Sequence, residues 1–251
     1  MNLGYWKKET ITYDEACQNM ACLIGDAIDL NASDYLLDNA VGYGPEVALW
    51  RNQYQIEHLV CCDPSKVSTD HLKATYKNEG AIYQTIDEVK NLEFTKIVVV
   101  DGAYHFKTRE QFFQDAYALL RPGGKVGLTD IILRDKISKF RIKLLSSFTA
   151  IPEENFITFQ EYEKMLQEIG FHNIHIETIT DHVLPPFADY LLQQAKQQAF
   201  VNRLFLWCLG YGVKFTDIFD YVVIDVEKAN IHRINDEETS DFSLGRNHRV
   251  F

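Results

Sequence analysis

Residues 36–47 constrain the fold of this chain more than any other stretch, because an apolar run meets two closely spaced glycines. The stretch reads L-L-D-N-A-V-G-Y-G-P-E-V, and its leading leucines suit a short buried strand. Gly42 and Gly44 permit backbone angles and close approaches that a side chain would block. Pro45 fits the first position of a helix, where its missing N–H costs no hydrogen bond. We expect a strand, a tight turn and a helix start whose free amides favour an anionic group.

The remaining sequence repeats this alternation of strand and helix. Apolar, β-branched runs such as K-I-V-V-V are typical of buried parallel strands, and amphipathic stretches separate them. The alternation predicts an α/β fold with a doubly wound sheet and helices on both faces. Pro185 and Pro186 are expected to form a turn before the last helix. The expected strands are 35–37, 56–63, 81–84, 96–100, 125–132, 173–180 and 221–226, and the expected helices are 13–30, 46–53, 68–78, 108–120, 158–169 and 188–210.

Residues 134–150 break the alternation. They are rich in basic residues, and their apolar side chains fall on one face of a helix. We expect a helical lid inserted at about 134–156, which suits an anionic or lipid-like acceptor or a membrane surface, with an ordinary solvated amphipathic helix as the alternative. Residues 230–251 are polar and charged, which predicts a loosely ordered tail. The basic residues are Arg134, Lys136, Lys139, Arg141 and Lys143, and the apolar ones are Ile137, Phe140, Leu144, Leu145 and Phe148.

Composition narrows the classes of function. The chain has 251 residues, which is long enough for one α/β domain with a lid or for two small domains, and 46% of them are apolar, which permits a large core. A net charge of −11 argues against a nucleic-acid binder, because phosphate contacts need clustered lysines and arginines. The five cysteines have no framework spacing, so we expect reduced thiols and a cytoplasmic protein. There is no signal-like start and no run of about 18 uncharged apolar residues, so no membrane span is predicted.

The glycine turn has two interpretations as a nucleotide site. A dinucleotide fingerprint starting at Gly42 would put Val47 at the third glycine, where its side chain obstructs the packing of helix on strand. Starting at Asp38 instead, the turn is D-x-A-x-G-x-G, with Ala40 at the first glycine position. About 20 residues later a strand ends at Asp63, whose carboxylate can bind two ribose hydroxyls. We favour ribose binding, with a turn or cap aspartate as the alternative.

An ordered set of motifs resembles the small-molecule branch of the class I S-adenosylmethionine-dependent methyltransferases, which act on sterols, tocopherols, quinones, sugars and other metabolites. The resemblance spans residues 4–227. It implies a Rossmann-like, seven-stranded, mostly parallel sheet with an antiparallel last strand, and one domain over 1–229 with an N-terminal lid segment. The motifs are G-Y-W at 4–6, L-L-D-N-A-V-G-Y-G at 36–44, C-D-P-S at 62–65, D-G-A-Y-H-F at 101–106, L-R-P-G-G-K at 120–125 and the late helix at 157–171.

The resemblance also implies a site for S-adenosylmethionine. Residues 38–44 would cradle its methionine part, Asp63 would bind the ribose, and Pro64 would lie beside the adenine. Ile86 and Asp87 fall where the family often contacts the adenine, although the usual G-D-A is missing. The implied cofactor-binding residues are Tyr5, Asp38, Ala40, Gly42, Gly44, Asp63, Pro64, Ile86, Asp87, Asp101 and Gly102, of which Tyr5 resembles a lid aromatic and the last two face the transferred methyl.

His105 is the candidate catalytic residue. A sulfonium methyl is already activated, so the protein mainly supplies proximity and alignment. A base helps only where the acceptor is a hydroxyl or a protonated amine, and histidine is suited to that task near neutral pH. The alternative is a histidine that fixes the shape of its loop. No metal site is expected, because the odd spacing of His172 and His175 places them on opposite faces of a strand.

The sequence does not identify the acceptor, and methylation at oxygen, nitrogen or carbon all remain open. Two alternative functions are an NAD(P)-binding oxidoreductase and a non-catalytic protein that kept the fold. We expect a small-molecule acceptor, no nucleic acid, a monomer or homodimer, and at most peripheral membrane contact. Aromatic residues of the lead-in and lid segments are candidates to line an acceptor pocket or to stabilise a cation, namely Tyr5, Trp6, Phe140, Phe148, Phe187 and Trp207.

Overall fold

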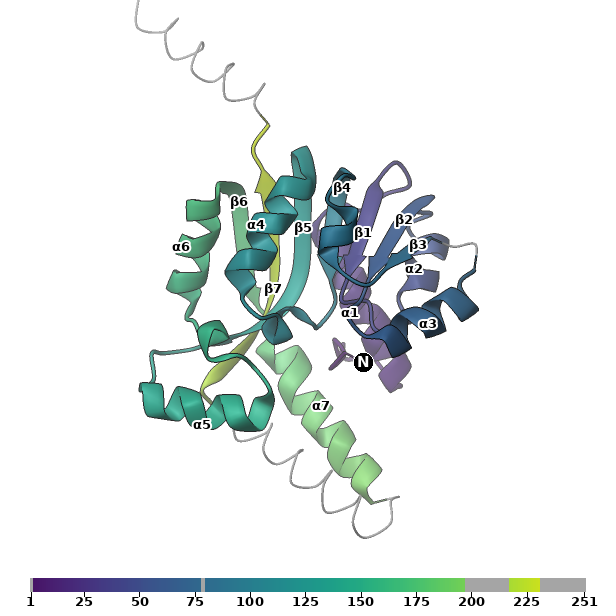
Figure 1. The fold of residues 1–251 in the computed structure, drawn as a ribbon. Coiled ribbons are helices and arrows are strands. Elements are labelled where there is room, and N and C mark those ends of the chain that lie inside the picture. The colour runs from purple at the N-terminus through teal and green to yellow at the C-terminus, as the bar shows by residue number, and fades with distance from the viewer. Residues whose placement is uncertain (1, 78–79, 197–216, 231–251) are drawn as a thin grey trace, which may run out of the picture.

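The described residues form a mixed sheet of seven strands with helices on both faces (Figure 1). The computed structural model describes residues 2–77, 80–196 and 217–230, so Trp207 and the predicted tail beyond 230 lie outside the described residues. The strand order is β3-β2-β1-β4-β5-β7-β6. The strands are β1 (Tyr35–Asn39), β2 (His58–Cys62), β3 (Ala81–Tyr83), β4 (Phe94–Val99), β5 (Leu120–Leu133), β6 (Phe171–Thr178) and β7 (Phe219–Lys228).

The direction of the strands confirms the predicted sheet. All the strand pairs among the first five strands, β1 to β5, are parallel, whereas β7 pairs antiparallel with both β5 and β6. The carboxyl ends of the parallel strands therefore meet at one edge, where open α/β sheets place their ligands. The loops that follow β1, β2 and β4 converge at this edge.

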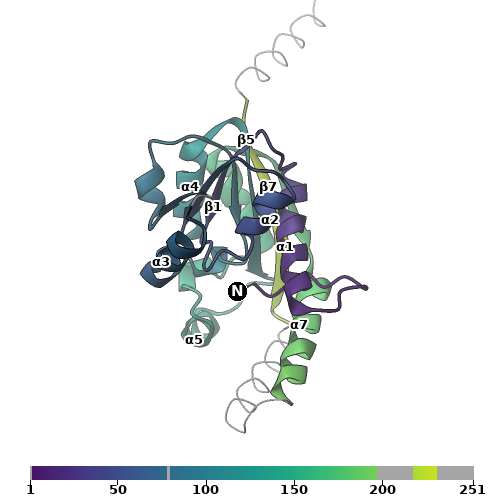
Figure 2. The ribbon, with the colours of Figure 1, turned by 90° about the vertical axis from the view of Figure 1, so that its right-hand side faces the viewer.

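Helices pack on each face of the sheet because successive strand residues point to opposite sides. Leu37 joins a core cluster with Phe113 of α4 and Tyr162 of α6, whereas Leu36 joins a second cluster with Trp50 of α2. Figure 2 shows α4 on one side of the sheet and α1 on the other. The helices are α1 (Tyr13–Ala27), α2 (Val47–Asn52), α3 (Lys66–Thr75), α4 (Arg109–Leu119), α5 (Lys139–Thr149), α6 (Phe159–Ile169) and α7 (Thr180–Ala195), with 3₁₀ turns η1 (Ile86–Val89), η2 (Ala103–His105) and η3 (Glu153–Asn155).

Local capping signals set the ends of α6 as the sequence predicts. The backbone N–H of Thr158 donates to the carboxylate of Glu161 at 3.0 Å, which completes a capping box. Gly170 ends the helix with a φ of 108°. The helix boundary follows from these residues alone, so no distant contact was needed to predict it.

Two predictions about prolines were wrong. Pro45 precedes α2 rather than opening it, because the N–H of Val47 bonds back to Gly44 and adds a turn before the helix. The helix expected at 188–210 begins at Thr180, and Pro185 and Pro186 lie inside it, while its expected part at 197–210 lies outside the described residues. Pro186 has no N–H for the carbonyl four residues earlier, which is that of His182. That carbonyl instead accepts a hydrogen bond of 2.8 Å from the N–H of Trp6.

The segment expected to form a lid contains α5, but its apolar side chains do not share one environment. Leu145 packs against a small core cluster that includes Leu133 and Phe156. Phe140 and Phe148 lie on the outside and are 77% and 80% exposed. The prediction of a single apolar face on this helix was therefore wrong. In Figure 1, α5 and α7 both lie beyond the edge of the sheet that is near the N-terminus.

Candidate active site

The glycine turn bends back over the end of β2. The N–H groups of Ala40 and Val41 both donate to the carbonyl of Cys62, at 2.8 and 3.2 Å. Ala40, Gly42 and Gly44 have positive φ angles of 63°, 58° and 71°. A left-handed conformation costs a non-glycine residue about 1–2 kcal/mol, so Ala40 holds strained backbone at the position where the resembling family has glycine.

The two glycines of the turn serve different purposes. A Cβ on Gly44 would lie 2.5 Å from the side chain of Leu72, so this glycine lets the turn pack against α3. A Cβ on Gly42 would meet no atom of the described residues within 4 Å. Gly102, after β4, would place a Cβ 3.1 Å from that of Ala40, so a small residue is needed where the two loops touch. Gly42 therefore borders open space beside Asp63.

Asp63 joins the glycine turn to the end of β2. Its Oδ2 accepts from the N–H of Gly42 at 2.8 Å, and its Oδ1 accepts from the N–H of Ser65 at 2.9 Å. The residue is only 7% exposed. A carboxylate has about four lone-pair positions, so two are left for a further donor. The structure thus places Asp63 beside Gly42, as the sequence predicts, and adds a structural task that the sequence did not indicate.

Two further carboxylates are buried behind the turn. Asp38 is fully buried, and its Oδ2 accepts from Nε1 of Trp50 at 2.7 Å. Its Oδ1 is buried without a hydrogen-bond partner among the described residues. Burial and the neighbouring Glu46 raise the pKa of Asp38 well above its ordinary value. Burial likewise raises the pKa of Glu46 to about 7, with a further contribution from Asp63. Sequence reasoning missed Glu46, which follows the motif as an apparently ordinary first-turn acid.

Asp101 anchors the N-terminal segment at the carboxyl edge. It has a φ of 55° and accepts three hydrogen bonds, from the N–H of Leu3 at 2.7 Å and from the hydroxyls of Tyr104 and Tyr221 at 2.7 and 2.5 Å. Burial raises the pKa of Asp101, and the hydrogen bonds from Tyr221 and Tyr104 oppose that rise. A carboxylate after β4 therefore holds the N-terminal segment and β7 beside its own loop.

The N-terminal segment then runs along α1 to α7. The N–H of Tyr5 donates to Ala16 at 2.8 Å, and the Tyr5 ring lies 5.1 Å from that of His182. The ring of Tyr13 stacks on Tyr190 at 4.7 Å. Tyr5 therefore contacts both α1 and α7. Its role as a lid aromatic over the cofactor stays a prediction.

Two clefts flank the glycine turn. One, of about 460 Å³, is lined by residues that include Tyr13, Pro45 and Glu46. The other, of about 350 Å³, is lined by residues that include Asn39 and Ile86. Ile86 therefore lines a cleft next to the end of β1, and its contact with the adenine stays a prediction. Asp87 and Pro64 are both exposed, Asp87 within η1 and Pro64 just before α3.

His105 lies at the end of η2, beside the lid segment. Its side chain is exposed, and its Nδ1 lies 3.3 Å from the carbonyl oxygen of Ala150. A carbonyl can only accept, so this contact requires the proton on Nδ1 and leaves the lone pair of the neutral ring on Nε2. The geometry is compatible with both predicted roles, because the same contact fixes the loop and prepares the other nitrogen as a base.

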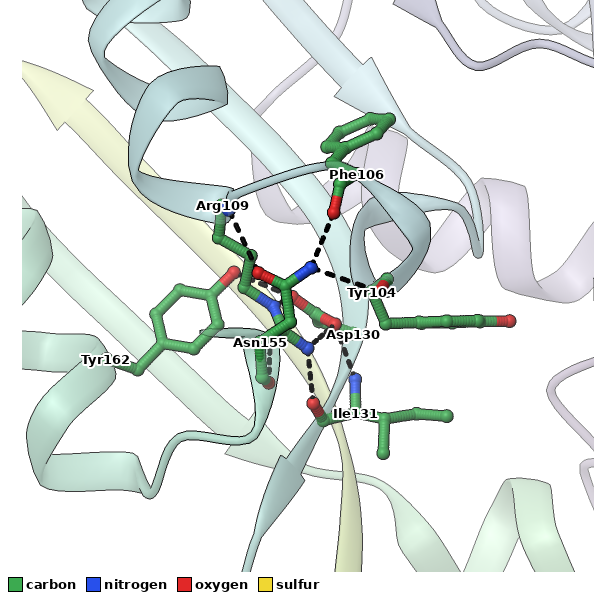
Figure 3. A network of polar contacts seen from close by, with 7 residues as sticks. All are labelled: Tyr104, Phe106, Arg109, Asp130, Ile131, Asn155 and Tyr162. Atoms are coloured by element: carbon green, nitrogen blue, oxygen red, sulfur yellow. Dashed lines mark hydrogen bonds and ion pairs between the residues drawn. The ribbon is translucent and has the colours of Figure 1, made fainter. Parts of the chain in front are cut away.

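A buried polar network fixes the loop that carries Asp101 and His105 (Figure 3). Nε and Nη2 of Arg109 donate to the two carboxylate oxygens of Asp130 at 2.6 and 2.7 Å, and Tyr162 adds a hydrogen bond of 2.8 Å. Burial alone would lower the pKa of Arg109, but Asp130 outweighs that effect and the pKa is raised.

Asn155 connects this ion pair to the loop. Its Nδ2 donates to the carbonyls of Phe106 and Tyr104 at 2.6 and 3.2 Å, and its own carbonyl accepts from Arg109 (Figure 3). The network therefore links α4, β5, η2 and η3. Sequence reasoning missed it, and the available signal was Asp130, a charged residue inside the mostly apolar second half of β5.

Comparison with known proteins identifies the family. The family model described as mycolic acid cyclopropane synthetase matches residues 3–202. The erythromycin 3''-O-methyltransferase of Saccharopolyspora erythraea is 30% identical over 234 residues, which cover 82% of this chain and 73% of that protein. The O-methyltransferase resE of Aspergillus sclerotiorum is 22% identical over 202 residues, with 74% and 73% covered. The chain belongs to the mycolic acid cyclopropane synthetase family.

Solved structures support the same class through the fold. The cyclopropane synthase MmaA2 from Mycobacterium tuberculosis superposes with a TM-score of 0.74 at 19% identity, covering 91% of this chain and 90% of that one. A putative sarcosine dimethylglycine methyltransferase from Galdieria sulphuraria gives 0.75 at 14% identity, with 91% and 93% covered. The predicted class is thereby confirmed: the chain is a class I S-adenosylmethionine-dependent methyltransferase of small molecules.

The residues at the carboxyl edge fit this cofactor. The unpartnered Oδ1 of Asp38 and the free lone pairs of Asp63 suit the cationic and hydroxyl groups of S-adenosylmethionine, and the open space at Gly42 leaves room for it. Among the residues that the structure describes, no helix is long and apolar enough to cross a membrane.

Proposed function

We propose that this methyltransferase acts on a hydroxyl group of its acceptor, with His105 as the base. The observation that carries the proposal is the contact between Nδ1 of His105 and the carbonyl of Ala150, which leaves Nε2 unprotonated in the neutral ring. Support also comes from the relatives, because both of the curated proteins compared above are named as O-methyltransferases. The cofactor supplies an activated methyl group, so the protein needs only to align the acceptor and remove its proton.

We assign the cofactor to the edge between the loops after β1, β2 and β4. Asp63 would hold the ribose with its two remaining lone pairs, and the turn at Gly42 would face the methionine part. Asp38 and Glu46 would stabilise the positive charges of the cofactor. Asp101 would keep the N-terminal segment, with Tyr5, in place as a wall over the site.

We also propose that the segment 134–156 acts as a lid. The segment 134–156 borders η2 through His105 and Ala150, and every residue of α5 is at least partly exposed. Such a weakly packed helix is suited to move when an acceptor binds. A monomer or homodimer and a location in the cytoplasm stay predictions.

The test combines product analysis with two substitutions at one position. Candidate acceptors with free hydroxyls are incubated with methyl-labelled cofactor, and mass spectrometry of the product locates the methyl. His105→Ala should lower kcat roughly 100-fold, as expected for loss of a general base. His105→Asn should be equally impaired, although its amide can still donate to Ala150. His172→Ala, on the exposed face of β6, is the matched control and should retain full activity.

Restored turnover in His105→Asn would contradict the base and would assign the histidine to loop structure. A methyl found on nitrogen or carbon would overturn the choice of acceptor atom. Neither result would change the family, because the family rests on the match over residues 3–202.

A further inference from the structure

The outer face of α5 combines exposed apolar side chains with positive charge. Phe140, Leu144 and Phe148 are 77%, 50% and 80% exposed. They account for three of the seven large apolar side chains that are exposed in the described ranges. Their spacing of four residues places all three within an arc of about 80° on the helix. A contiguous apolar strip on a water-soluble surface marks an interaction site more often than an isolated residue does.

Basic residues border this strip on both sides. Lys139, Arg141 and Lys143 belong to the same helix, all are exposed, and the sequence from 139 to 149 contains no acidic residue. The neighbouring Lys136 is paired with Glu161 at 2.8 Å, so its charge is compensated. The nearest acidic residues further along the chain, Glu153 and Glu154, lie on η3. Local positive charge is unexpected on a chain whose net charge is −11.

The opposite face of α5 is already occupied. Ile142 and Leu145 pack against the cluster that contains Leu133, Ile151 and Phe156. The helix therefore has an inner apolar contact with its own domain and a separate outer strip. This arrangement holds the strip at the surface, instead of leaving it available to turn inward.

We infer that the outer strip of α5 docks on the surface of an anionic phospholipid membrane. Phenylalanine rings flanked by lysine and arginine suit the boundary between acyl chains and negatively charged headgroups. A second copy of the chain is a poorer occupant, because a two-fold contact through α5 would place its three cations against the same three cations. The inference is independent of the acceptor, since it concerns binding of the protein to a bilayer.

Docking at this face would also orient the active site. In Figure 1, α5 lies beyond the same edge of the sheet at which the N-terminal segment and the loop after β4 meet. Contact between His105 and Ala150 joins that loop to the end of α5. A bilayer bound to the strip would therefore lie beyond the carboxyl edge, on the side of the sheet where the site is proposed.

The test is flotation of the full chain with two kinds of vesicle, one of phosphatidylcholine and one containing about a third phosphatidylglycerol. We expect roughly tenfold stronger binding to the anionic vesicles, which 0.5 M salt should reduce. Lys139→Gln, Arg141→Gln and Lys143→Gln together should remove the preference for anionic lipid. Phe140→Ser with Phe148→Ser should remove binding to both vesicles. All five side chains are exposed, so these variants should keep their circular dichroism.

Matched controls carry the same changes at exposed positions elsewhere. Lys66→Gln, Lys73→Gln and Lys164→Gln remove three charges from α3 and α6, and Ile11→Ser with Val67→Ser removes two exposed apolar side chains. Both control proteins should bind like the parent. A Phe140→Trp variant should in addition show stronger fluorescence quenching by lipids with brominated acyl chains than the parent does.

Equal binding of the parent to both vesicles, or binding by the α5 variants at the parent level, would overturn the inference. So would a dimer in sedimentation that dissociates in Phe140→Ser with Phe148→Ser while vesicles are not bound, because the strip would then be a contact between two copies.

Discussion

The two halves of the carboxyl edge treat their buried polar groups in opposite ways. Around Arg109, almost every polar atom has a partner, and the ion pair with Asp130 is extended by Tyr162 and Asn155. Around the glycine turn, the Oδ1 of Asp38 has no partner among the described residues, and Gly42 borders open space. The first half is completed by the protein itself, whereas the second leaves a buried oxygen without a partner and space that the proposed cofactor would fill.

This difference separates stability from binding. A satisfied buried network fixes one arrangement of its elements. Removing one partner destabilises the fold strongly, because the other partner is left buried and unpaired. Unpaired carboxylates and strained backbone cost free energy in the folded state and are retained where they serve a site. Substitutions in the network should therefore change stability first, and substitutions around the turn should change cofactor affinity first.

The largest effect is expected at Arg109. Arg109→Ala leaves Asp130 buried without its cation, which should lower the free energy of unfolding by about 3–5 kcal/mol. Urea denaturation followed by circular dichroism measures it. Arg121→Ala is the matched control, because that side chain is 50% exposed and lies 3.5 Å from Glu93, where an ion pair contributes at most about 1 kcal/mol. Equal losses in the two variants would contradict the comparison.

Gly42→Val should break the other half while sparing the fold. Its branched side chain would enter the open space beside Asp63 and should weaken S-adenosylmethionine binding by at least about 3 kcal/mol, or 100-fold, measured by calorimetry. Gly123→Val is matched for backbone strain, since Gly123 has a φ of 76° and lies in β5 away from the turn. Both variants should lose similar stability, and only the first should lose affinity. Tight binding by Gly42→Val would place the site on another loop.

Asp63→Ala tests a residue that belongs to both categories. Loss of charge-assisted hydrogen bonds to the ribose should weaken cofactor binding by about 1.5–3 kcal/mol. The same change releases the N–H groups of Gly42 and Ser65, so a smaller loss of stability should accompany it. Glu57→Ala, at an exposed position before β2, is the control in calorimetry and thermal melting. Unchanged affinity in a folded variant would remove Asp63 from the site.

Glu46 gives the smallest expected effect and depends on pH. Its folded-state pKa of about 7 lies above its ordinary 4.5, so the folded chain holds the proton more tightly and loses stability as the pH rises between these values. Glu46→Gln should therefore stabilise the protein by about 1–2 kcal/mol at pH 8 and hardly at all at pH 4.5.

Cofactor affinity should show the opposite trend in the parent protein. A cationic cofactor favours the ionised carboxylate, so the affinity of the parent should rise as the pH increases through about 7, and Glu46→Gln should remove this rise. Glu57→Gln should leave both pH profiles unchanged. Identical profiles for the parent and Glu46→Gln would contradict a cationic ligand beside this residue.

The sequence predicted those parts of the molecule that depend on neighbouring residues. Strand and helix alternation predicted the fold class, and the capping box at Thr158 predicted the start of α6. The spacing from Asp38 to Asp63 predicted that the glycine turn and the end of β2 lie together. The glycine turn was recognisable because its requirements, small residues at positive φ, are visible in the residues themselves. These features need no knowledge of what lies far away in the chain.

The sequence failed where two distant segments share a task. Arg109 and Asp130 are 21 residues apart, and nothing in either neighbourhood indicates the partner. The burial that raises the pKa of Glu46 also depends on packing around it. The sequence assigned Pro185 and Pro186 to a turn. It does not reveal that the N–H of Trp6, far away along the chain, replaces the hydrogen bond that Pro186 cannot make inside α7.

The bond between Trp6 and His182 has a consequence for how the protein is made. The Trp6 carbonyl also lies 3.3 Å from Nδ1 of His182, across 176 residues of sequence. As a ribosome synthesises the chain, α7 emerges late, long after the first strands can pair. Contacts of such high sequence separation form slowly, because the loop between them must close first. Leu3 and Tyr5 can bond to Asp101 and Ala16 earlier, whereas the contact that joins Trp6 to α7 forms only after nearly the whole domain has been synthesised.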